Sequence, residues 1–418
     1  MANVRTVSWL AVFLFTGLAW AQSNDRERYQ SNVFNANEAV ANKIELAKWK
    51  LGNWFFDPSW QLNQLGYNSN VFSTEENQVS DYSVEPGVGL AMYYRPSARV
   101  IWKNEIKGSY AYYLDTESLR GFQYLGESRM YFLQKRFNLD IGARFTRDQE
   151  RLNSEVDARS FNRNSVFDLN SVFDLPGRGF LKTRAYYRNL TFDRDESNFD
   201  PEYSELERDE VSASMTYLVK VRPQFWPYVQ GSVIKGFFDS ENNRRDDSTL
   251  SGLFFGVRNE FLRRTHFNLR VGLTRLRFPN DQAADTEKVD IRSFYTHKVS
   301  RRFSINATAQ QTPIYSVFEA YSYYLSTRVS LGALYETRSQ WGWGPVLTAG
   351  RNAYSLIPGL QVDKREDDWI EGGLRIKFPS RVLKETFLNI TYYKRDSNIE
   401  GLSDDGVQIY TSFSQGNF

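Results

Sequence analysis

The chain contains no cysteine and only two histidines among its 418 residues. Without cysteine, neither a disulfide nor a thiolate metal site can form, and two histidines give a transition metal too few ligands. The sequence also lacks a Gly-rich phosphate loop and the ordered Asp-x-Asp-x-Asp-Gly spacing of a calcium loop. The acidic segments 193–196 and 363–368 are interpreted as solvated charge, with an oxygen-ligand calcium site as the open alternative. The sequence therefore predicts no cofactor and no metal.

Long apolar runs are also lacking, apart from the first residues of the chain. Residues 1–21 combine Arg5, an apolar stretch from Trp9 to Trp20 and a small-x-small site that ends at Ala21. This pattern is typical of a secretory signal peptide, which is too short to anchor a chain in a membrane. We expect export and cleavage after Ala21. No later segment is apolar enough for a membrane-spanning helix.

Excess charge of one sign is absent, since 52 basic residues face 50 acidic ones for a net charge of +2. Nothing in that balance favours nucleic acid as a partner. Aromatic residues make up 16% of the chain and hydrophobic residues 41%. This mixture is too aromatic for a disordered chain and too polar for a helical membrane protein. A β-barrel resolves the conflict, because only every second residue of its strands must be apolar.

Apolar residues recur at helical spacing between residues 22 and 53. Val40, Ile44, Ala47 and Leu51 lie in a stretch rich in Ala, Lys and Glu, which predicts a short amphipathic helix on the periplasmic side. This helix either rests against the rim of a barrel or enters the lumen as a small plug. Residues 22–53 are thus interpreted as a periplasmic N-terminal segment, and residues 54–418 as the barrel.

From residue 54 onward the apolar period changes to two. Val100, Trp102 and Ile106 share one face of a predicted strand, and Lys103 and Lys107 share the other. Such runs are about as long as a tilted bilayer-crossing strand, roughly 9–11 residues, which favours a membrane barrel over a soluble sandwich. Short turns, predicted as periplasmic, alternate with longer segments predicted as outer loops, namely 68–82, 147–159, 193–209, 239–249, 279–287, 355–367 and 396–405. Counting strands between these connections predicts an all-β, transmembrane, antiparallel up-and-down barrel of about 18 strands.

Alternation also assigns a set of charged side chains to the water-filled interior of this barrel. The pore-lining candidates are Lys103, Glu105, Lys107, Arg129, Asp140, Arg144, Lys182, Arg184, Arg188, Arg258, Glu260, Arg270, Arg292, Arg328, Glu371 and Arg375. We expect most of them to pair across strands and keep the interior soluble. Basic residues exceed acidic ones, most clearly on the strand with Lys182, Arg184 and Arg188. This excess favours an anionic solute.

Tyrosine doublets recur near predicted strand ends, as in Tyr323-Tyr324 and Tyr392-Tyr393. Only one member of each doublet can face lipid, where its ring joins an aromatic girdle at the membrane interface. The other member faces the lumen. There it either fills the wall or offers a stacking surface to a sugar.

Two segments resemble known outer-membrane sequences. Residues 60–72 read WQLNQLGYNSNVF, and after an acidic loop a second strand opens with Val84, Glu85, Pro86 and Gly87. This arrangement resembles the start of the outer-membrane β-barrel porins of the porin 2 type, several of which belong with exopolysaccharide gene sets. The resemblance implies a porin architecture, and it defines no binding residues that could be carried over.

The C-terminal segment 406–418 resembles the signal by which the barrel-assembly machinery recognises its clients. The aromatic residues Tyr410 and Phe418 carry this resemblance, and Gly416 departs from it at a position where an aromatic residue is common. The resemblance implies that this machinery is a folding partner of the chain.

An enzyme is not expected. His266 and His297 both lie at or near predicted periplasmic turns, away from the outer leaflet where barrel hydrolases act. We expect a channel in the Gram-negative outer membrane, surrounded by lipid, for passive diffusion of small polar or anionic solutes. The alternative is a conduit for export of a polysaccharide. The oligomeric state stays open, because lipid and a neighbouring subunit both demand an apolar outer face.

Overall fold

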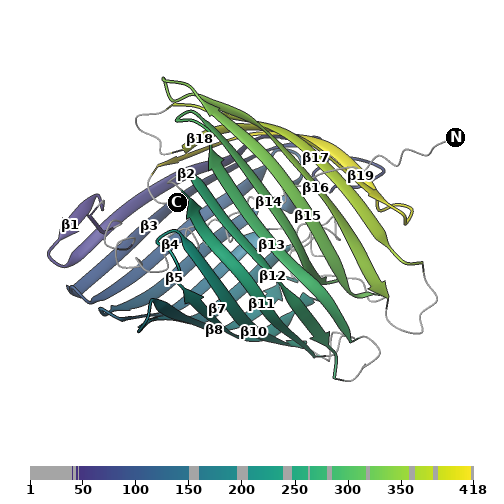
Figure 1. The fold of residues 1–418 in the computed structure, drawn as a ribbon. Coiled ribbons are helices and arrows are strands. Elements are labelled where there is room, and N and C mark those ends of the chain that lie inside the picture. The colour runs from purple at the N-terminus through teal and green to yellow at the C-terminus, as the bar shows by residue number, and fades with distance from the viewer. Residues whose placement is uncertain are drawn as a thin grey trace.

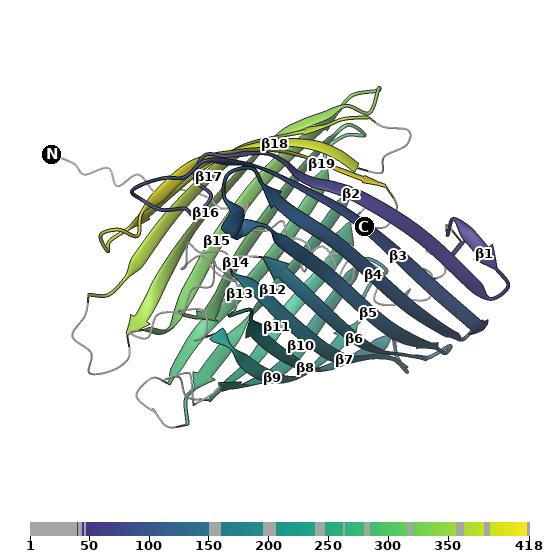
Figure 2. The same ribbon diagram turned by 180° about the vertical axis from the view of Figure 1, so that it is seen from behind.

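A computed structural model of the chain describes residues 40, 44–45, 47–149, 160–194, 206–238, 247–261, 264–279, 285–316, 321–356, 363–379 and 385–415. Within these residues a single antiparallel sheet closes on itself as a barrel (Figures 1 and 2). The strands are β1 (Trp49–Leu51), β2 (Trp54–Asn68), β3 (Asp81–Ser97), β4 (Val100–Tyr113), β5 (Gly121–Leu133), β6 (Phe137–Gln149), β7 (Phe161–Leu175), β8 (Gly179–Phe192), β9 (Arg208–Val219), β10 (Phe225–Phe238), β11 (Ser248–Phe261), β12 (Thr265–Arg277), β13 (Thr286–Lys298), β14 (Phe303–Tyr315), β15 (Tyr321–Glu336), β16 (Gly342–Leu356), β17 (Glu366–Lys377), β18 (Glu385–Ser397) and β19 (Asp404–Gln415).

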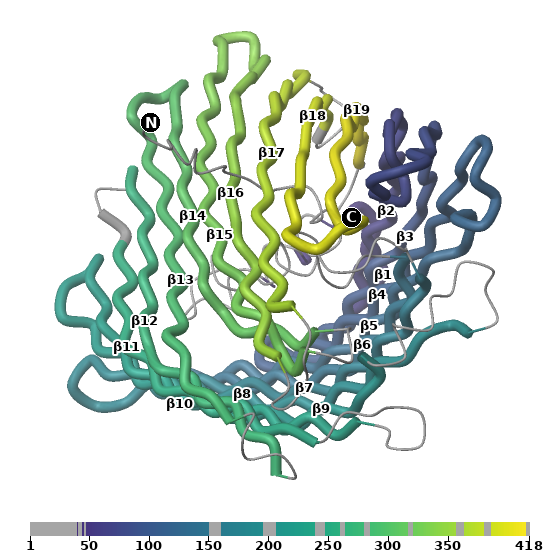
Figure 3. The backbone as a smooth tube through the Cα atoms, turned by 90° about the vertical axis from the view of Figure 1, so that its right-hand side faces the viewer, coloured from purple at the N-terminus to yellow at the C-terminus, as the bar shows by residue number. Residues whose placement is uncertain are grey.

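The closed ring consists of β2 to β19, arranged around one axis (Figure 3). Each of these strands pairs with its sequence neighbours, and β19 pairs with β2 to complete the ring. Because β1 is an additional strand outside the ring, the 19-stranded sheet contains an 18-stranded barrel. The predicted fold class and strand number are confirmed.

The ring strands are longer than the sequence predicted, with 12 to 17 residues each. At about 3.3 Å per residue and a tilt of about 45°, a strand of 13 residues covers roughly 30 Å along the membrane normal. Strands of this length cross the hydrocarbon core completely. The prediction of shorter strands was wrong because alternation was counted only where the outer face is apolar, whereas the hydrogen-bonded ladder continues beyond the lipid.

Exposure alternates along the strands as the sequence predicted. On β4, Trp102 and Ile106 are exposed on the convex side, and Glu105 and Lys107 are buried on the concave side. On β11 and β12 the exposed residues are again apolar, as for Phe255 and Leu273. A contiguous apolar surface of this extent requires lipid around it.

Connections alternate between the two ends of the barrel. One end carries the short turns, such as residues 98–99 and 176–178, and the other carries most of the longer loops, such as 69–80 and 193–207. Two connections at the outer end, 114–120 and 316–320, were missed by the sequence analysis because they are nearly as short as the turns. The first contains a 3₁₀ turn, η1 (Glu117–Leu119).

β1 lies at the seam where the barrel closes. Among the described residues, β19 pairs with β2 from its outer end as far as Trp60, short of the periplasmic end of β2. β1 pairs at that end, with Trp49 opposite Phe56 and Leu51 opposite Trp54. An uncovered strand edge presents unpaired backbone groups, and β1 satisfies part of this edge. The turn that joins β1 to β2 contains Gly52 at φ +58°, a left-handed value that glycine adopts without strain.

The N-terminal predictions fall mostly outside the described residues. The signal peptide at residues 1–21 lies there entirely, and its cleavage stays a prediction. Val40, Ile44 and Glu45 have helical backbone, which is too little to establish the predicted periplasmic helix. No helix in the described part of the chain is long and apolar enough to cross a membrane.

Candidate functional site: the inner face of the barrel

A continuous network of ion pairs covers the inner face of β4 and β5. Lys103 Nζ lies 3.0 Å from Glu127 Oε2 and also contacts Glu105. The other oxygen of Glu105 lies 2.7 Å from Lys107 Nζ. Arg129 Nε donates to Glu127 Oε1 at 3.0 Å. The structure thus brings together Lys103, Glu105, Lys107 and Arg129 with Glu127, all of which alternation along the sequence assigns to this face.

Arg129 extends this network across β6 to β7. Its guanidinium donates to both oxygens of Asp168, at 2.9 and 2.6 Å, and contacts Asp140. A Cβ atom at Gly142 on β6 would lie 2.6 Å from Arg129 Cζ, so the missing side chain lets the guanidinium pass over this strand. Asn170 Nδ2 donates to Asp140 and Asp168, at 2.9 and 2.6 Å. Side chains from strands two apart converge in this way on the concave side of a curved sheet.

The network on β4 to β7 is electrically balanced. Arg144 completes it, with Nη2 at 3.7 Å from Glu127 Oε1. Its cations are Lys103, Lys107, Arg129 and Arg144, and its carboxylates are Glu105, Glu127, Asp140 and Asp168. Because every charge of this network has a close opposite, the network itself adds little net potential for a solute.

The adjoining wall, on β8 and β9, has a different composition. Arg188 Nη1 lies 3.5 Å from Glu210 Oε2, and Arg208 Nε lies 2.7 Å from Glu210 Oε1. Two guanidinium groups therefore share one carboxylate. Lys182 and Arg184 lie on the same face of β8, each partly exposed, and the guanidinium of Arg184 lies 5.4 Å from the ring of Tyr186.

The same sharing recurs on β12 and β13. Arg270 Nη2 lies 2.8 Å from Asp290 Oδ1, and Arg292 Nη2 lies 3.6 Å from Asp290 Oδ2. Thr312 on β14 donates a hydrogen bond to the same carboxylate at 3.1 Å. Arg258 on β11 is opposite Asn268 in the register and shares this inner face. Among the described side chains of β8 to β13, inward cations therefore outnumber inward carboxylates.

The remaining candidates line β15 to β18. Arg328 lies 5.2 Å over the ring of Trp369, and Glu371 adds a favourable charge interaction with it. Arg375 donates from Nε to Asn389 Oδ1 at 2.9 Å and lies 5.4 Å from the ring of Phe387. These cations are thus held against aromatic rings and amides of neighbouring strands.

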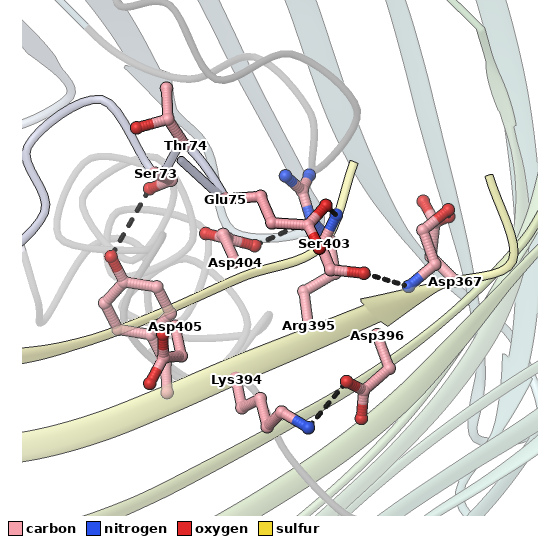
Figure 4. A network of polar contacts seen from close by, with 12 residues as sticks. Ser73, Thr74, Glu75, Asp367, Lys394, Arg395, Asp396, Ser403, Asp404 and Asp405 are labelled. Atoms are coloured by element: carbon pink, nitrogen blue, oxygen red, sulfur yellow. Dashed lines mark hydrogen bonds and ion pairs between the residues drawn. The ribbon is translucent and has the colours of Figure 1, made fainter. Parts of the chain in front are cut away.

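Loop 69–80 folds over the outer mouth of the barrel. Val71 is fully buried against Tyr113 on β4 and Leu119 of η1. On the opposite side of the loop, Tyr393 on β18 donates to the carbonyl oxygen of Asn70 at 3.1 Å. Figure 4 shows the loop residues Ser73, Thr74 and Glu75 beside the outer ends of β18 and β19, where Glu75 accepts a hydrogen bond from the Ser403 amide at 3.3 Å. The loop is therefore fixed to strands on both sides of the seam.

The outer tip of the β14–β15 hairpin folds into the barrel as well. β13 and β14 pair only up to Gln311, whereas β14 and β15 stay paired to Tyr315 and Tyr323. Tyr315 reaches Ser248 on β11, with 2.6 Å between the hydroxyl oxygens, and Tyr323 is buried against Leu276 of β12. The opposite face of the tip packs Tyr324 on Tyr354 of β16, with ring centroids 5.1 Å apart.

This tip corrects the prediction for one tyrosine doublet. Tyr323 and Tyr324 are both buried, at 4% and 1% exposure, so neither faces lipid. The doublet Tyr392-Tyr393 behaves as predicted, because Tyr392 is exposed and Tyr393 contacts the inward loop. A period-two pattern assumes that each strand stays in the wall, and the hairpin tip leaves it.

Arg208 is the functional candidate that the sequence analysis missed. Segment 193–209 was interpreted as an outer loop, whereas β9 begins at Arg208. Its guanidinium lies 5.3 Å from the ring of Tyr315 and 5.9 Å from that of Phe238, at the outer end of the cationic wall. The available signal was its spacing of two residues from Glu210, which places both on one face of a strand.

Three further predicted residues, Glu260, Tyr410 and Phe418, are described by the structure only partly or not at all. Glu260 lies in β11, but its side chain is outside the described part of the structure. Tyr410 on β19 is opposite Asn389 in the register and shares its inward face, whereas Ile409 is exposed on the outer face. Phe418 lies outside the described residues, so the assembly signal stays a prediction.

The two histidines lie at the end of the barrel that carries the short turns. His266 is the second residue of β12, and His297 Nδ1 lies 2.7 Å from Thr265 Oγ1. Among the described residues, no group of three or more His, Cys, Asp or Glu side chains is arranged to hold a metal ion.

Comparisons with known proteins identify the architecture. No protein-family model and no curated protein matches the chain. The outer membrane protein OpdK from Pseudomonas aeruginosa is similar over 87% of this chain and 99% of its own, with TM-score 0.55 and 10% identity. OpdK with vanillate (TM-score 0.52, 11% identity) and OccAB3 from Acinetobacter baumannii (TM-score 0.51, 9% identity) match with the same coverage. At these identities the likeness shows the fold, which is the closed outer-membrane β-barrel that the sequence predicted.

Proposed function

We propose that this protein is an outer-membrane channel of Gram-negative type that passes small anionic solutes by passive diffusion. The observation that carries the proposal is the unequal charge of the inner face. The cations of the ion-pair network on β4 to β7 do not outnumber its carboxylates, whereas on β8 and β9 two guanidinium groups share Glu210 while Lys182 and Arg184 add further positive charge. A barrel of about 16–18 strands is wide enough for an aqueous path, and local positive potential raises the concentration of anions within it.

The cationic wall extends over neighbouring strands, which suits a diffusing solute better than one tight site. Arg208 lies at the outer end of β9, Arg188 near the outer end of β8, and Arg184 and Lys182 follow towards the other end. Further around the ring, Asp290 on β13 is shared by the guanidinium groups of Arg270 on β12 and Arg292 on β13. A solute that exchanges between several weak cationic contacts enters readily and also leaves readily. Such an array supports diffusion rather than retention.

The comparisons support the same solute class. OpdK, a similar barrel, is known with vanillate, which is an organic anion. The similarity is one of fold, so the identity of the solute in this protein remains part of the proposal. A polysaccharide conduit receives no support from these comparisons. Catalysis is not proposed, because the two histidines lie at the turn-bearing end.

The proposal is tested by refolding the mature chain into planar bilayers and measuring single-channel current and reversal potential in a potassium chloride gradient. We expect discrete conductance steps and a preference for chloride over potassium. In parallel, liposome swelling with sugars and carboxylates of graded size should show faster uptake of small carboxylates than of neutral sugars of equal size. A silent bilayer, or a channel that prefers cations, would overturn the proposal. Absence of uptake for every small solute would favour a closed conduit instead.

A further inference from the structure

The N-terminal segment contacts the inside of the barrel, on the wall formed by β3 to β5. Ile44 is 1% exposed and belongs with Val40 to an apolar cluster that also contains Ala91, Tyr93, Ile101 and Leu133. The last four residues have the inward parity of their strands, since Ile101 shares its face with Lys103 of the ion-pair network. Phe55 and Tyr131 pack against the same cluster. The segment therefore occupies the lumen and not the outer rim.

This cluster lies at the end of the barrel that carries the short turns. Ile101 is the second residue after turn 98–99, and Leu133 is the last residue of β5. The ion-pair network on Lys103 and Glu127 begins directly above it. The segment thus lies over the inner wall of β3 to β5 at the periplasmic mouth.

Two further contacts hold the segment in place. Lys48 Nζ donates to the carbonyl oxygen of Pro58 on β2 at 2.8 Å, and β1 pairs with β2 immediately afterwards. The chain therefore passes from the lumen, over the end of β2, to the seam. Both ends of the described segment are attached to the barrel, one by apolar packing and one by strand pairing.

We propose that the described residues between positions 40 and 47 form an intramolecular plug that docks on the inner wall of β3 to β5 and sets the periplasmic aperture of the channel. The effect on the aperture rests on the proposed function, whereas docking of the segment is independent of transport. A piece of chain with its side chains inside the mouth takes up part of the aqueous cross-section.

Docking is tested by thiol accessibility, and the measurement has no background labelling because the chain has no cysteine. Ile44→Cys replaces a buried side chain with a smaller apolar one, and Glu45→Cys, the adjacent exposed position, is the matched control. In the folded protein in detergent, we expect a maleimide to react at least about tenfold more slowly at position 44 than at position 45, since a docked site reacts only when it opens locally. Equal rates at the two positions would overturn docking.

The aperture is tested by single-channel conductance of Ile44→Asp. A carboxylate against Tyr93 and Ile101 is costly to bury, so the segment should leave the wall while the barrel stays folded. Undocking is checked in the same variant by Val40→Cys, which should gain the maleimide reactivity of an exposed site. We expect conductance to rise about twofold or more in Ile44→Asp and to stay unchanged in Glu45→Ala. Unchanged conductance in an undocked Ile44→Asp would overturn the plug, whereas absence of current in every variant would refute the channel and leave the docking result valid.

Discussion

Removing positive charge from β8 should reduce the preference of the channel for anions. The variant that tests this replaces Lys182, Arg184 and Arg188 together by Gln. Glu210, which interacts with Arg188 at 3.5 Å, keeps its closer partner Arg208 at 2.7 Å, so the variant leaves no buried carboxylate without a cation. The three side chains are partly exposed on the inner face, and Gln preserves most of their length.

The size of the effect follows from Coulomb interaction in water. A unit charge about 10 Å from a permeating ion contributes about 0.4 kcal/mol, which screening at 0.1 M salt reduces to about 0.15 kcal/mol. Three charges give about 0.5 kcal/mol, which is roughly twofold for an anion and the inverse for a cation. The anion-to-cation permeability ratio should therefore fall about fivefold at 0.1 M salt. At 0.01 M, where the Debye length is about 30 Å, the same reasoning gives a fall of about twentyfold.

Reversal potentials in potassium chloride gradients at both salt concentrations provide the measurement. The matched control is Lys103→Gln with Glu127→Gln, which removes a cation and a carboxylate that lie 3.0 Å apart and leaves the net charge unchanged. We expect the control to retain the permeability ratio. If the triple variant and the control behave alike, or if the effect does not grow at low salt, the inner face of β8 does not set selectivity and the reasoning is refuted.

Two further variants probe how the structure is held together. Gly142→Val should displace the Arg129 guanidinium, whose Cζ would lie 2.6 Å from the new Cβ, and lower the free energy of unfolding from lipid vesicles by about 3 kcal/mol, as the loss of a buried ion pair does. Gly126→Val, where a Cβ meets no atom within 4 Å, should shift the urea midpoint far less, and equal shifts would contradict the role of Arg129. Asp81→Ala removes a carboxylate that accepts hydrogen bonds from the amides of Leu114 and Thr116, at 3.1 and 2.7 Å, so trypsin should cleave after Arg120 about tenfold faster. Glu117→Ala, which removes only a surface ion pair with Arg120, should leave cleavage nearly unchanged, and a reversed order of the two variants would speak against this anchoring.

The architecture was predictable because the face that a side chain occupies in a barrel wall depends on its position within its own strand. Side chains alternate between lipid and water at every second residue, so the inward placement of Lys103 and Lys107 follows from the sequence around them. Short turns and longer loops are also recognisable from their amino-acid composition. Strand number and fold class depend only on these local signals.

The interior was less predictable because its contacts are not local. Arg129 meets Asp168 across β6, which requires both the register of three strands and the gap at Gly142. The inward fold of the β14–β15 tip depends on the contact of Tyr315 on β14 with Ser248 on β11, three strands away in the ring. Neither contact has a signature in the sequence of one strand. Alternation predicts which face of the strand a side chain occupies, but it does not predict which residue that side chain contacts.

These non-local contacts distinguish two parts of the inner face, one on β2 to β7 and the other on β8 to β13. Along β2 to β7, the segment at Ile44, the network around Arg129 and loop 69–80 at Val71 follow one another from the periplasmic to the outer end. That part is packed and rich in buried contacts and ion pairs, so changes there should act mainly on stability. The part on β8 to β13 carries the excess cations, and at its outer end the ring of Tyr315 lies beside Arg208. We expect a solute that crosses the barrel to pass along the charged wall of β8 to β13, because a wide 18-stranded ring selects by charge only where the solute comes within about a Debye length of the fixed charges.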